Sequence, residues 1–431
     1  MHSERKKNQS SIHRPALPIR AGRRLIWHLR LFAQRSLRAS KKILRYPVVL
    51  ITSQPAVKKR RDQRALYKLL KNKYGYSPSP LSNERLRVVL LMRDGTTYPK
   101  SSAFIRLIAP FTHPFMRGKV FFTVLDSNTT QVSADTDICI VQRTAFDTQM
   151  AAEQLVKNLR ANGTKLVVDN DDAFSLLDES HAEHSAKDQK HEALEYLLKK
   201  ADQVWVSTNA LVKLYEDQAS SIHVIKNTLD ARIWKHGTSP ATGNRLQMVY
   251  MGTATHDADF DLLMNVLDIV EKSFPGKFQL TVIGVSSRAL PDRPWIRRLY
   301  QPPGGAIYPN FVDWFVKQGP FDLGLCPLID TAFNSCKSDI KCLDYIALGA
   351  LPVASNVPAY KTRGLDKYII KLDNTEGAWV EGLTTILRDI ATFREQKHTT
   401  VTNAQTYLWS KRSSEVAARD IYHKLSALNR H

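Results

Sequence analysis

One stretch near the carboxyl end decides the fold. Residues 333–356 have the sequence FNSCKSDIKCLDYIALGALPVASN. The spacing of Ile340 and Leu343 predicts a helix, with Ser338 as its expected N-cap. The last six residues, LPVASN at 351–356, form an apolar run of the length of a buried strand. The stretch therefore predicts a helix that leads into a strand of a parallel sheet.

Strand-like apolar runs alternate with helical patterns on both sides of this stretch. In the first half the expected strands are residues 87–92, 118–125, 136–143, 164–171, 203–208 and 222–227. In the second half they are residues 246–252, 278–284, 321–328, 351–356 and 368–372. Such alternation is typical of a doubly wound parallel sheet. We therefore expect an α/β protein with two Rossmann-like domains facing a cleft, and ligands beyond the carboxyl ends of the strands.

Composition predicts the domain boundaries. A Pro/Gly/Ser-rich linker at residues 236–245 separates an N-terminal Rossmann-like domain, residues 83–235, from a C-terminal one, residues 246–395. Residues 1–82 are predicted to be a basic N-terminal extension, and residues 396–431 a helical C-terminal segment. The chain of 431 residues is long enough for two domains with full hydrophobic cores.

The net charge of +21 is concentrated at the N-terminus. Residues 1–75 hold 21 Lys/Arg and two Asp/Glu, whereas the remaining 356 residues hold 41 and 39. Residues 23–45 also have the spacing of a basic amphipathic helix. This favours contact of residues 1–75 with an anionic membrane surface. A helix packed on the body and a nucleic-acid-binding tail are the alternatives, but the nearly neutral body argues against a nucleic-acid partner.

Cysteine usage and hydropathy predict the compartment. The four cysteines show no CxxC spacing, which favours buried free thiols in a reducing compartment. No run approaches the ~18 apolar residues of a membrane span, and the N-terminus lacks the pattern of a secretory signal. We expect a cytoplasmic protein that is peripheral on the inner face of the membrane.

The first set of candidate binding residues lies on the helix after Ser338. Lys337, Lys341 and Asp344 are spaced four and three apart, so they line a single stripe. Two ammonium groups near the positive end of a helix suit a diphosphate, and a carboxylate one turn further suits a ribose diol. The alternative is a solvent-exposed Lys–Asp pair, which contributes little stability.

The second candidate segment is MGTATHDADF at residues 251–260. It follows an expected strand and opens a helix, so Gly252 lets the backbone approach a ligand, and Thr253 with the free amides can donate hydrogen bonds to phosphate. The alternative is an ordinary strand–turn–helix with a threonine N-cap. The chain contains no GxGxxG and no P-loop motif, so neither a Rossmann dehydrogenase nor a P-loop NTPase is supported.

In their order along the chain, these segments resemble the GT-B glycosyltransferases called group 1 or family 4, particularly members that act on bacterial surface polysaccharides. The resemblance covers roughly residues 85–420. Its motifs are VWVSTNAL (204–211), VIKNTLDARIW (224–234), YMGTATHDADFDLL (250–263), YPNFVDWF (308–315), FDLGLCPLIDTAFN (321–334) and KSDIKCLDYIALGALPVASNVPAY (337–360).

The resemblance implies transfer of a sugar from a nucleotide diphosphate-sugar, held mainly by the C-terminal domain, to a glycan or lipid-linked acceptor at the N-terminal domain. It also implies retention of anomeric configuration without a metal ion, so the nucleotide sugar is a co-substrate and no cofactor is expected. The family's diphosphate-binding positions match Gly252, Thr253 and Lys341. Its ribose-binding carboxylate, the second acid of an E-x7-E pattern, matches Asp344.

The chain departs from the family's pattern at two places. The first acid of E-x7-E falls at Cys336, which cannot accept hydrogen bonds as a carboxylate does. The usual Arg and Lys after the phosphate turn are absent, with Thr253, His256 and Asp257 in that neighbourhood, and Lys337 is expected to supply charge. These departures leave open a catalytically silent protein that binds a nucleotide sugar or glycan as a sensor or scaffold.

The N-terminal half offers three candidates for the chemistry. Arg106 follows the first expected strand and its loop, and His181 and His184 follow the acidic run VVDNDDAF at residues 167–174. Either histidine can contact the donor sugar or activate the acceptor. The alternatives are surface histidines and an exposed helix arginine. The three aspartates of the run predict either acceptor contacts or a DxD metal site, and two similar halves argue against the metal.

Overall fold

The computed structural model describes most of the chain. The described residues are 54–77, 85–97, 99–177, 187–234, 241–252, 257–284 and 290–430. The chain divides into two compact units, Met1–Val57 and Lys58–His431. The second unit holds both sheets. The helix expected over residues 23–45 lies outside the described residues.

The first half of the second unit is built on a six-stranded parallel sheet with the order β2-β1-β3-β4-β5-β6. Its strands are β1 Leu86–Met92, β2 Val120–Asp126, β3 Ile138–Gln142, β4 Lys165–Asn170, β5 Gln203–Val206 and β6 Ile222–Val224. Successive residues of β1 enter different cores, Leu90 on one face and Leu91 on the other. Because both faces are covered, the strands are continuous apolar runs.

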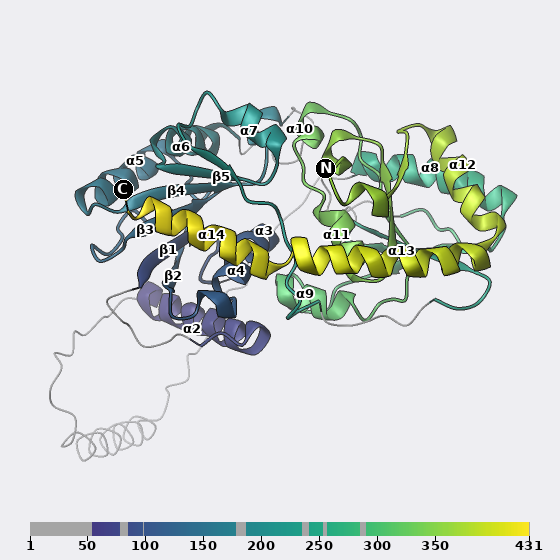
Figure 1. The fold of residues 1–431 in the computed structure, drawn as a ribbon, viewed down its shortest axis with the longest axis horizontal. Helices are drawn as coiled ribbons and strands as arrows, with labels where there is room; N and C mark the ends of the chain where they lie inside the picture. The colour runs from purple at the N-terminus through teal and green to yellow at the C-terminus, as the bar shows by residue number, and fades with distance from the viewer. Residues whose placement is uncertain are drawn as a thin grey trace, which may run out of the picture. The chain divides into compact units, whose positions relative to one another are not determined.

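Helices cover both faces of this sheet (Figure 1). One face carries α5 Gln149–Ala161, α6 Lys187–Lys200 and α7 Asn209–Tyr215. The other carries α2 Gln54–Tyr74, α3 Ser101–Ala103, the π-helical η1 Phe104–Ile108 and α4 Ala109–Phe111. Helix α2 lies within the expected basic extension, where no helix over these residues was predicted. Leu66, Leu70 and Tyr74 at four-residue spacing are the missed signal, and all three are buried.

The second half is built on another six-stranded parallel sheet, with the order β12-β11-β10-β7-β8-β9. Its strands are β7 Leu246–Met251, β8 Phe278–Ile283, β9 Ile296–Leu299, β10 Leu323–Cys326, β11 Leu351–Ser355 and β12 Ile370–Leu372. Strand β9 was not predicted, because an edge strand with two arginines has no apolar run. The two sheets confirm the expected α/β fold with two doubly wound halves.

Helices also cover both faces of the second sheet. Helices α8 Asp257–Ser273 and α12 Glu376–Arg388 pack on one face. The other face carries α9 Tyr308–Phe315, α11 Ile340–Ala347 and α13 Ile390–Lys411. A short helix, α10 Ala332–Ser335, precedes α11.

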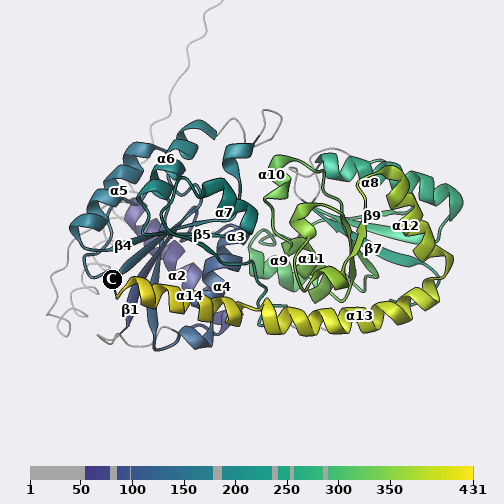
Figure 2. The same cartoon turned by 45° about the horizontal axis from the view of Figure 1, so that its top comes forward.

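The last helix, α14 Ser414–Leu428, returns to the first half and packs against α4 and η2 Pro114–Met116 (Figure 2). At the α13–α14 junction, the N–H of Leu229 donates to the carbonyl of Arg412 at 2.9 Å, and the N–H of Ser414 donates to the carbonyl of Leu229 at 2.8 Å. The chain after β6 and the α13–α14 junction therefore lie side by side where they cross between the two halves.

Candidate functional site

The carboxyl ends of β7 and β8 bring two glycines into contact. The N–H of Gly252, after β7, donates to the carbonyl of Ile283 at 3.1 Å. Gly284, after β8, has φ of +71°, and a Cβ on it would lie 2.6 Å from the Gly252 carbonyl oxygen. Only glycine permits this backbone approach. Gly252 was predicted as a site residue, whereas Gly284, which ends its apolar run in the same way, was not. Thr253 and His256 lie outside the described residues.

Lys341 lies in the first turn of α11 with a buried ammonium group. The residue keeps some exposed surface, but its Nζ is buried and has no hydrogen-bond partner among the described residues. The nearest described aromatic ring is that of Tyr250, whose centroid lies 5.5 Å from Nζ. Burial lowers the pKa of Lys341. A buried ammonium without a hydrogen-bond partner is costly, so the site favours a bound anion.

Asp344 lies one turn further along α11 and is 8% exposed. Its Oδ1 is buried without a hydrogen-bond partner in the described part of the chain. Burial raises the pKa of Asp344 well above its ordinary value, and the charge of Lys341 opposes this shift. The alternative of a solvent-exposed Lys–Asp pair is wrong, because both charged groups are buried. A carboxylate oxygen in this state can accept hydrogen bonds from ligand hydroxyl groups.

Ser338 does not cap α11 as expected. The N-cap is Asp339, and its side chain makes no capping hydrogen bond. The Oγ of Ser338 instead accepts a hydrogen bond from Asn227 Nδ2 at 2.8 Å. A partner 111 residues away therefore displaces the local cap. Lys337, the preceding residue, lies over the Phe333 ring with Nζ 4.7 Å from its centroid.

Cys336, the residue at the family's glutamate position, faces the N-terminal half. It is 6% exposed and packs in the hydrophobic cluster that α5, α6 and α7 form with the first sheet. Its carbonyl oxygen accepts a hydrogen bond from Thr208 Oγ1 at 3.0 Å. Burial raises the pKa of its thiol, with Asp172 as a second cause. Cys336 therefore contributes packing, and all four cysteines are free and buried.

Arg106 is neither exposed nor open to a substrate. It is 2% exposed, and its Nε and Nη2 donate to the carboxylate of Asp169, the closest contact being 2.6 Å. Its Nη1 donates to the carbonyl of Ile225 at 2.8 Å and to Asn227 Oδ1 at 2.9 Å. Arg106 was expected to face the cleft. It instead forms a buried ion pair with Asp169 and positions the chain after β6.

The other two aspartates of the acidic run pair with Arg143 at the carboxyl end of β3. Arg143 Nε lies 2.9 Å from Asp171, and its Nη2 donates to Asp172 at 2.6 Å. Arg143 has φ of +50°, and such backbone strain in a non-glycine residue is frequent at functional sites. Burial raises the pKa of Asp172, while Arg143 and Lys337 lower it. His181 and His184 lie outside the described residues.

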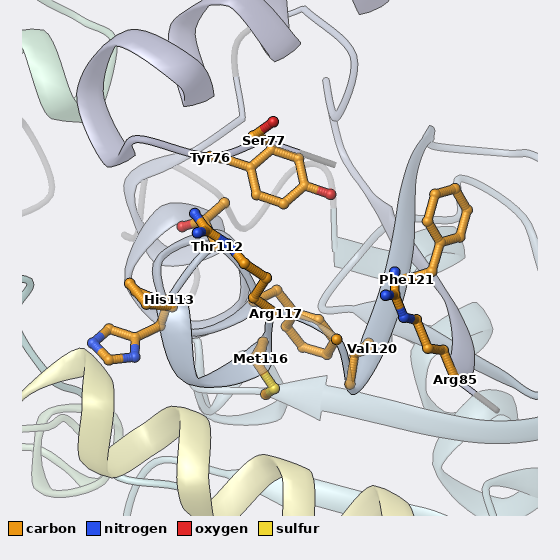
Figure 3. A pocket seen from close by; sticks show the side chains of 12 residues that line it. Tyr76, Ser77, Arg85, Thr112, His113, Met116, Arg117, Val120 and Phe121 are labelled. Atoms are coloured by element: carbon orange, nitrogen blue, oxygen red, sulfur yellow. The ribbon is translucent and has the colours of Figure 1, made fainter. Parts of the chain in front are cut away.

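A separate pocket lies at the amino ends of β1 and β2. Tyr76, Arg85 and Arg117 lie around it, as Figure 3 shows. Arg117 is exposed. No sequence pattern had pointed to this pocket. Its position, at the opposite edge of the sheet from Arg143, makes it distinct from the site on α11.

Two comparisons with known proteins give no relative. No protein-family model matches the sequence, and no curated protein matches it.

Comparison with solved structures gives a clear result for the fold. The chain is similar to a glycosyltransferase from Rickettsia africae, with 12% identity, a TM-score of 0.54, and 80% of this chain covering 99% of that one. It is similar to an alpha-glucosyltransferase solved with UDP-glucose and DNA containing an abasic site, with 13% identity, a TM-score of 0.53, and coverage of 79% and 99%. It is also similar to HepE from Anabaena, solved with UDP-glucose, with 12% identity, a TM-score of 0.53, and coverage of 80% and 100%. The chain therefore has the two-domain α/β fold of the GT-B glycosyltransferases.

Proposed function

We propose that the protein is a glycosyltransferase that moves a sugar, of the hexosyl or a related type, from a nucleotide diphosphate-sugar to a glycan or lipid-linked acceptor. The observation that carries the proposal is the unpartnered pair of buried groups on α11, the ammonium of Lys341 and the carboxylate of Asp344. Both lie on one helix of a fold whose solved examples include complexes with UDP and UDP-glucose. A nucleotide diphosphate is the ligand that offers both an anion and a ribose diol.

Each donor contact follows from the chemistry of one group. Lys341, with Lys337 beside it, neutralises the diphosphate, and Asp344 accepts hydrogen bonds from the ribose hydroxyls. The close backbones at Gly252 and Gly284 leave room for the phosphates, and we propose that Thr253 and His256, which follow Gly252 in the sequence, also contact them. Ser338 contributes to donor binding by helping to fix the start of α11, which carries Lys341. UDP is the first nucleotide to test, because solved proteins of the same fold carry it.

The proposed chemistry is electrostatic. Negative charge accumulates on the leaving diphosphate as the glycosidic bond to the sugar breaks, and fixed cations stabilise that charge. Lys341 and Lys337 supply these cations from protein side chains, so we propose a metal-independent reaction, and the family resemblance implies retention. His181 or His184 then contacts the donor sugar or activates the acceptor hydroxyl.

The test is a thermal-shift panel of nucleotide diphosphates and their sugars. We expect one base to raise the Tm of the wild type, because a ligand that binds only the folded state stabilises it. The Lys341→Ala, Asp344→Ala double variant should lose this rise. Arg117→Ala, in the separate pocket, is the matched control and should keep it. A wild type that responds to no nucleotide contradicts the proposal.

A catalytically silent nucleotide-sugar sensor is the second candidate, and Cys336 favours it. The family's glutamate position carries a thiol that packs into the N-terminal half. A silent protein binds the donor but never releases nucleotide diphosphate, whereas an enzyme releases it on adding acceptor. Coupled detection of the released diphosphate separates the two.

We also propose that the protein docks at the inner, cytoplasmic face of a membrane, where polysaccharide precursors carried on lipid are extended. Helix α2 exposes Arg64, Lys68 and Lys71 at spacings of four and three, so the three cations form one stripe opposite Leu66 and Leu70. Each basic residue near an anionic surface contributes about 1 kcal/mol. In the residues that the structure describes, no helix has the length and apolar character to span a bilayer.

Co-sedimentation with phosphatidylglycerol-containing vesicles tests the docking. Reversing the stripe with Arg64→Glu, Lys68→Glu and Lys71→Glu should reduce binding more than tenfold, at about 1 kcal/mol per residue. Reversal of Lys199, Lys200 and Lys213, which are exposed on α6 and α7, is the matched control. Equal binding by both variants contradicts the proposal. Salt-dependent DNA binding that the stripe variant alone loses would replace the membrane with a nucleic acid.

A further inference from the structure

Three of the four residues that lead into α11 are held from outside their own sheet. Thr208 Oγ1, before α7, donates to the carbonyl of Cys336 at 3.0 Å. Asn227 Nδ2, after β6, donates to Ser338 Oγ at 2.8 Å. The guanidinium of Arg412, at the α13–α14 junction, donates to both oxygens of Asp339 at 2.8 and 2.6 Å. The N-terminal half and the C-terminal crossover therefore fix the start of the candidate donor helix.

These contacts belong to one continuous buried network. Arg412 Nε and Nη2 donate to the carbonyl of Asn227 at 3.1 and 2.9 Å. The Oδ1 of Asn227 accepts from Arg106 at 2.9 Å, and Arg106 is paired with Asp169 on β4. Arg106, Asp169, Asn227, Asp339 and Arg412 are each at most 6% exposed. Because buried charged groups hold their partners by strong hydrogen bonds, the network links β4 rigidly to α11.

The network matters because it holds the start of α11, whose later residues pack against β10, β11 and α13. The helix has eight residues, and its N-cap side chain, Asp339, is turned to Arg412 rather than to the helix amides. Burial lowers the pKa of Arg412, but the hydrogen bond and charge of Asp339 raise it more, so Arg412 stays charged. Lys341 and Asp344 follow Asp339 by two and five residues on the same rigid helix. A rotation of the helix start moves both.

We infer that Asn227 and Arg412 are positioning residues for donor binding. Through them, the N-terminal half fixes the positions of Lys341 and Asp344. The inference rests on the proposed function, since it assumes that these two groups meet the nucleotide. Beyond that function, we expect donor affinity to depend on contacts between the two halves. The residues that make these contacts do not touch the nucleotide.

The test compares two arginine–aspartate pairs, Arg412 with the buried Asp339 and the half-buried Arg394 with the buried Asp322. Lysine at 412 keeps the charge but cannot make the forked contact to Asp339 together with both bonds to Asn227. We expect Arg412→Lys and Asn227→Ala to weaken UDP binding about tenfold by calorimetry, the effect of losing one charged hydrogen bond. Arg394→Lys is the matched control: Arg394 on α13 donates to Asp322 at 3.0 and 2.8 Å without reaching α11.

Hydrogen exchange of the α11 amides in nucleotide-free protein is the second measurement. The inference predicts faster exchange in Arg412→Lys than in Arg394→Lys, together with the weaker UDP binding. If the α11 amides of Arg412→Lys exchange faster but the variant binds UDP as tightly as the wild type, the network only stabilises the fold, and the inference is overturned. Exchange equal to that of the control also overturns it. If the wild type binds no nucleotide, the proposed function fails, and exchange alone decides whether the network positions α11.

Discussion

Both sheets have a buried ion pair beyond their carboxyl ends, but the second also carries the buried charges of Lys341 and Asp344. In the N-terminal half, Arg106 and Asp169 are each 1% exposed in their side chains and bound to one another. Arg143 is likewise held by two aspartates. In the C-terminal half, Lys341 and Asp344 are also buried, yet each has a charged atom without a hydrogen-bond partner among the described residues.

The difference distinguishes charged groups that stabilise the fold from charged groups that can bind a ligand. Breaking a buried ion pair leaves its partner uncompensated and destabilises the protein, whereas removing an unpaired buried charge relieves a desolvation cost. Sites built for ligands carry such a cost in the free protein. Stability measurements on variants of the two edges therefore test the assignment of each residue without knowledge of the substrate.

The largest effect is expected for Arg106→Met. Asp169 then stays buried without its cation, which costs about 3 to 5 kcal/mol of unfolding free energy. Urea denaturation followed by circular dichroism measures the loss. The double variant Arg106→Met, Asp169→Leu should recover most of it, because no buried charge remains. A single variant as stable as the wild type would mean that this edge is not held by its ion pair.

A smaller loss is expected for Cys336→Glu, which restores the acid of the family's pattern. Cys336 packs in the N-terminal hydrophobic cluster near Asp172, so a carboxylate there is desolvated and close to a like charge. We expect a loss of about 1 to 3 kcal/mol and no gain in turnover. Cys336→Ala is the control for packing alone. Stable protein with new diphosphate release would show instead that position 336 reaches the donor.

The fold was predictable because its signal is local. Apolar runs of five to seven residues between helical patterns marked β1 and β7, and the matching strands lie where these runs are. Strand β9 and helix α2 were missed because basic residues interrupt their apolar patterns. An edge strand with two arginines has no apolar run, and the apolar stripe of α2 is hidden among lysines and arginines.

The site was predictable only in part, because pairing is not local. Helical spacing alone placed Lys341 and Asp344 on one stripe, and the structure has them buried on one helix. No pattern pointed to the partner of Arg106, which lies 63 residues away. Ser338 was expected to cap its own helix, and a partner in the other half of the protein overrode that local preference.

Removing Lys341, a charge beyond the carboxyl end of the second sheet without a hydrogen-bond partner among the described residues, should raise the unfolding free energy, whereas removing Arg106 lowers it. We expect Lys341→Met to raise the unfolding free energy of the free protein by about 1 to 2 kcal/mol, because a desolvated ammonium is replaced by an apolar chain of similar length. UDP binding should fall at least tenfold. Urea denaturation with and without UDP measures both. A destabilised variant would mean that Lys341 has a structural partner.

The smallest effect concerns pH and Asp344. Burial raises its pKa in the folded protein above the ordinary value of 3.8. A raised folded pKa favours the protonated form, so this contribution to stability is full below 3.8 and is lost as the pH rises through the folded pKa. Compared with Asp344→Asn, the wild type should therefore lose Tm as the pH rises above about 4.

A second variant distinguishes this titration from the other carboxylates. The charge of Lys341 holds the pKa of Asp344 down, so Lys341→Met should move the end of the Tm decline to higher pH. Carboxylates whose charged partner is another residue have no such dependence on Lys341. A Tm difference between wild type and Asp344→Asn that is flat with pH would mean that Asp344 is ionised and already satisfied. The contrast between the two sheets would then rest on Lys341 alone.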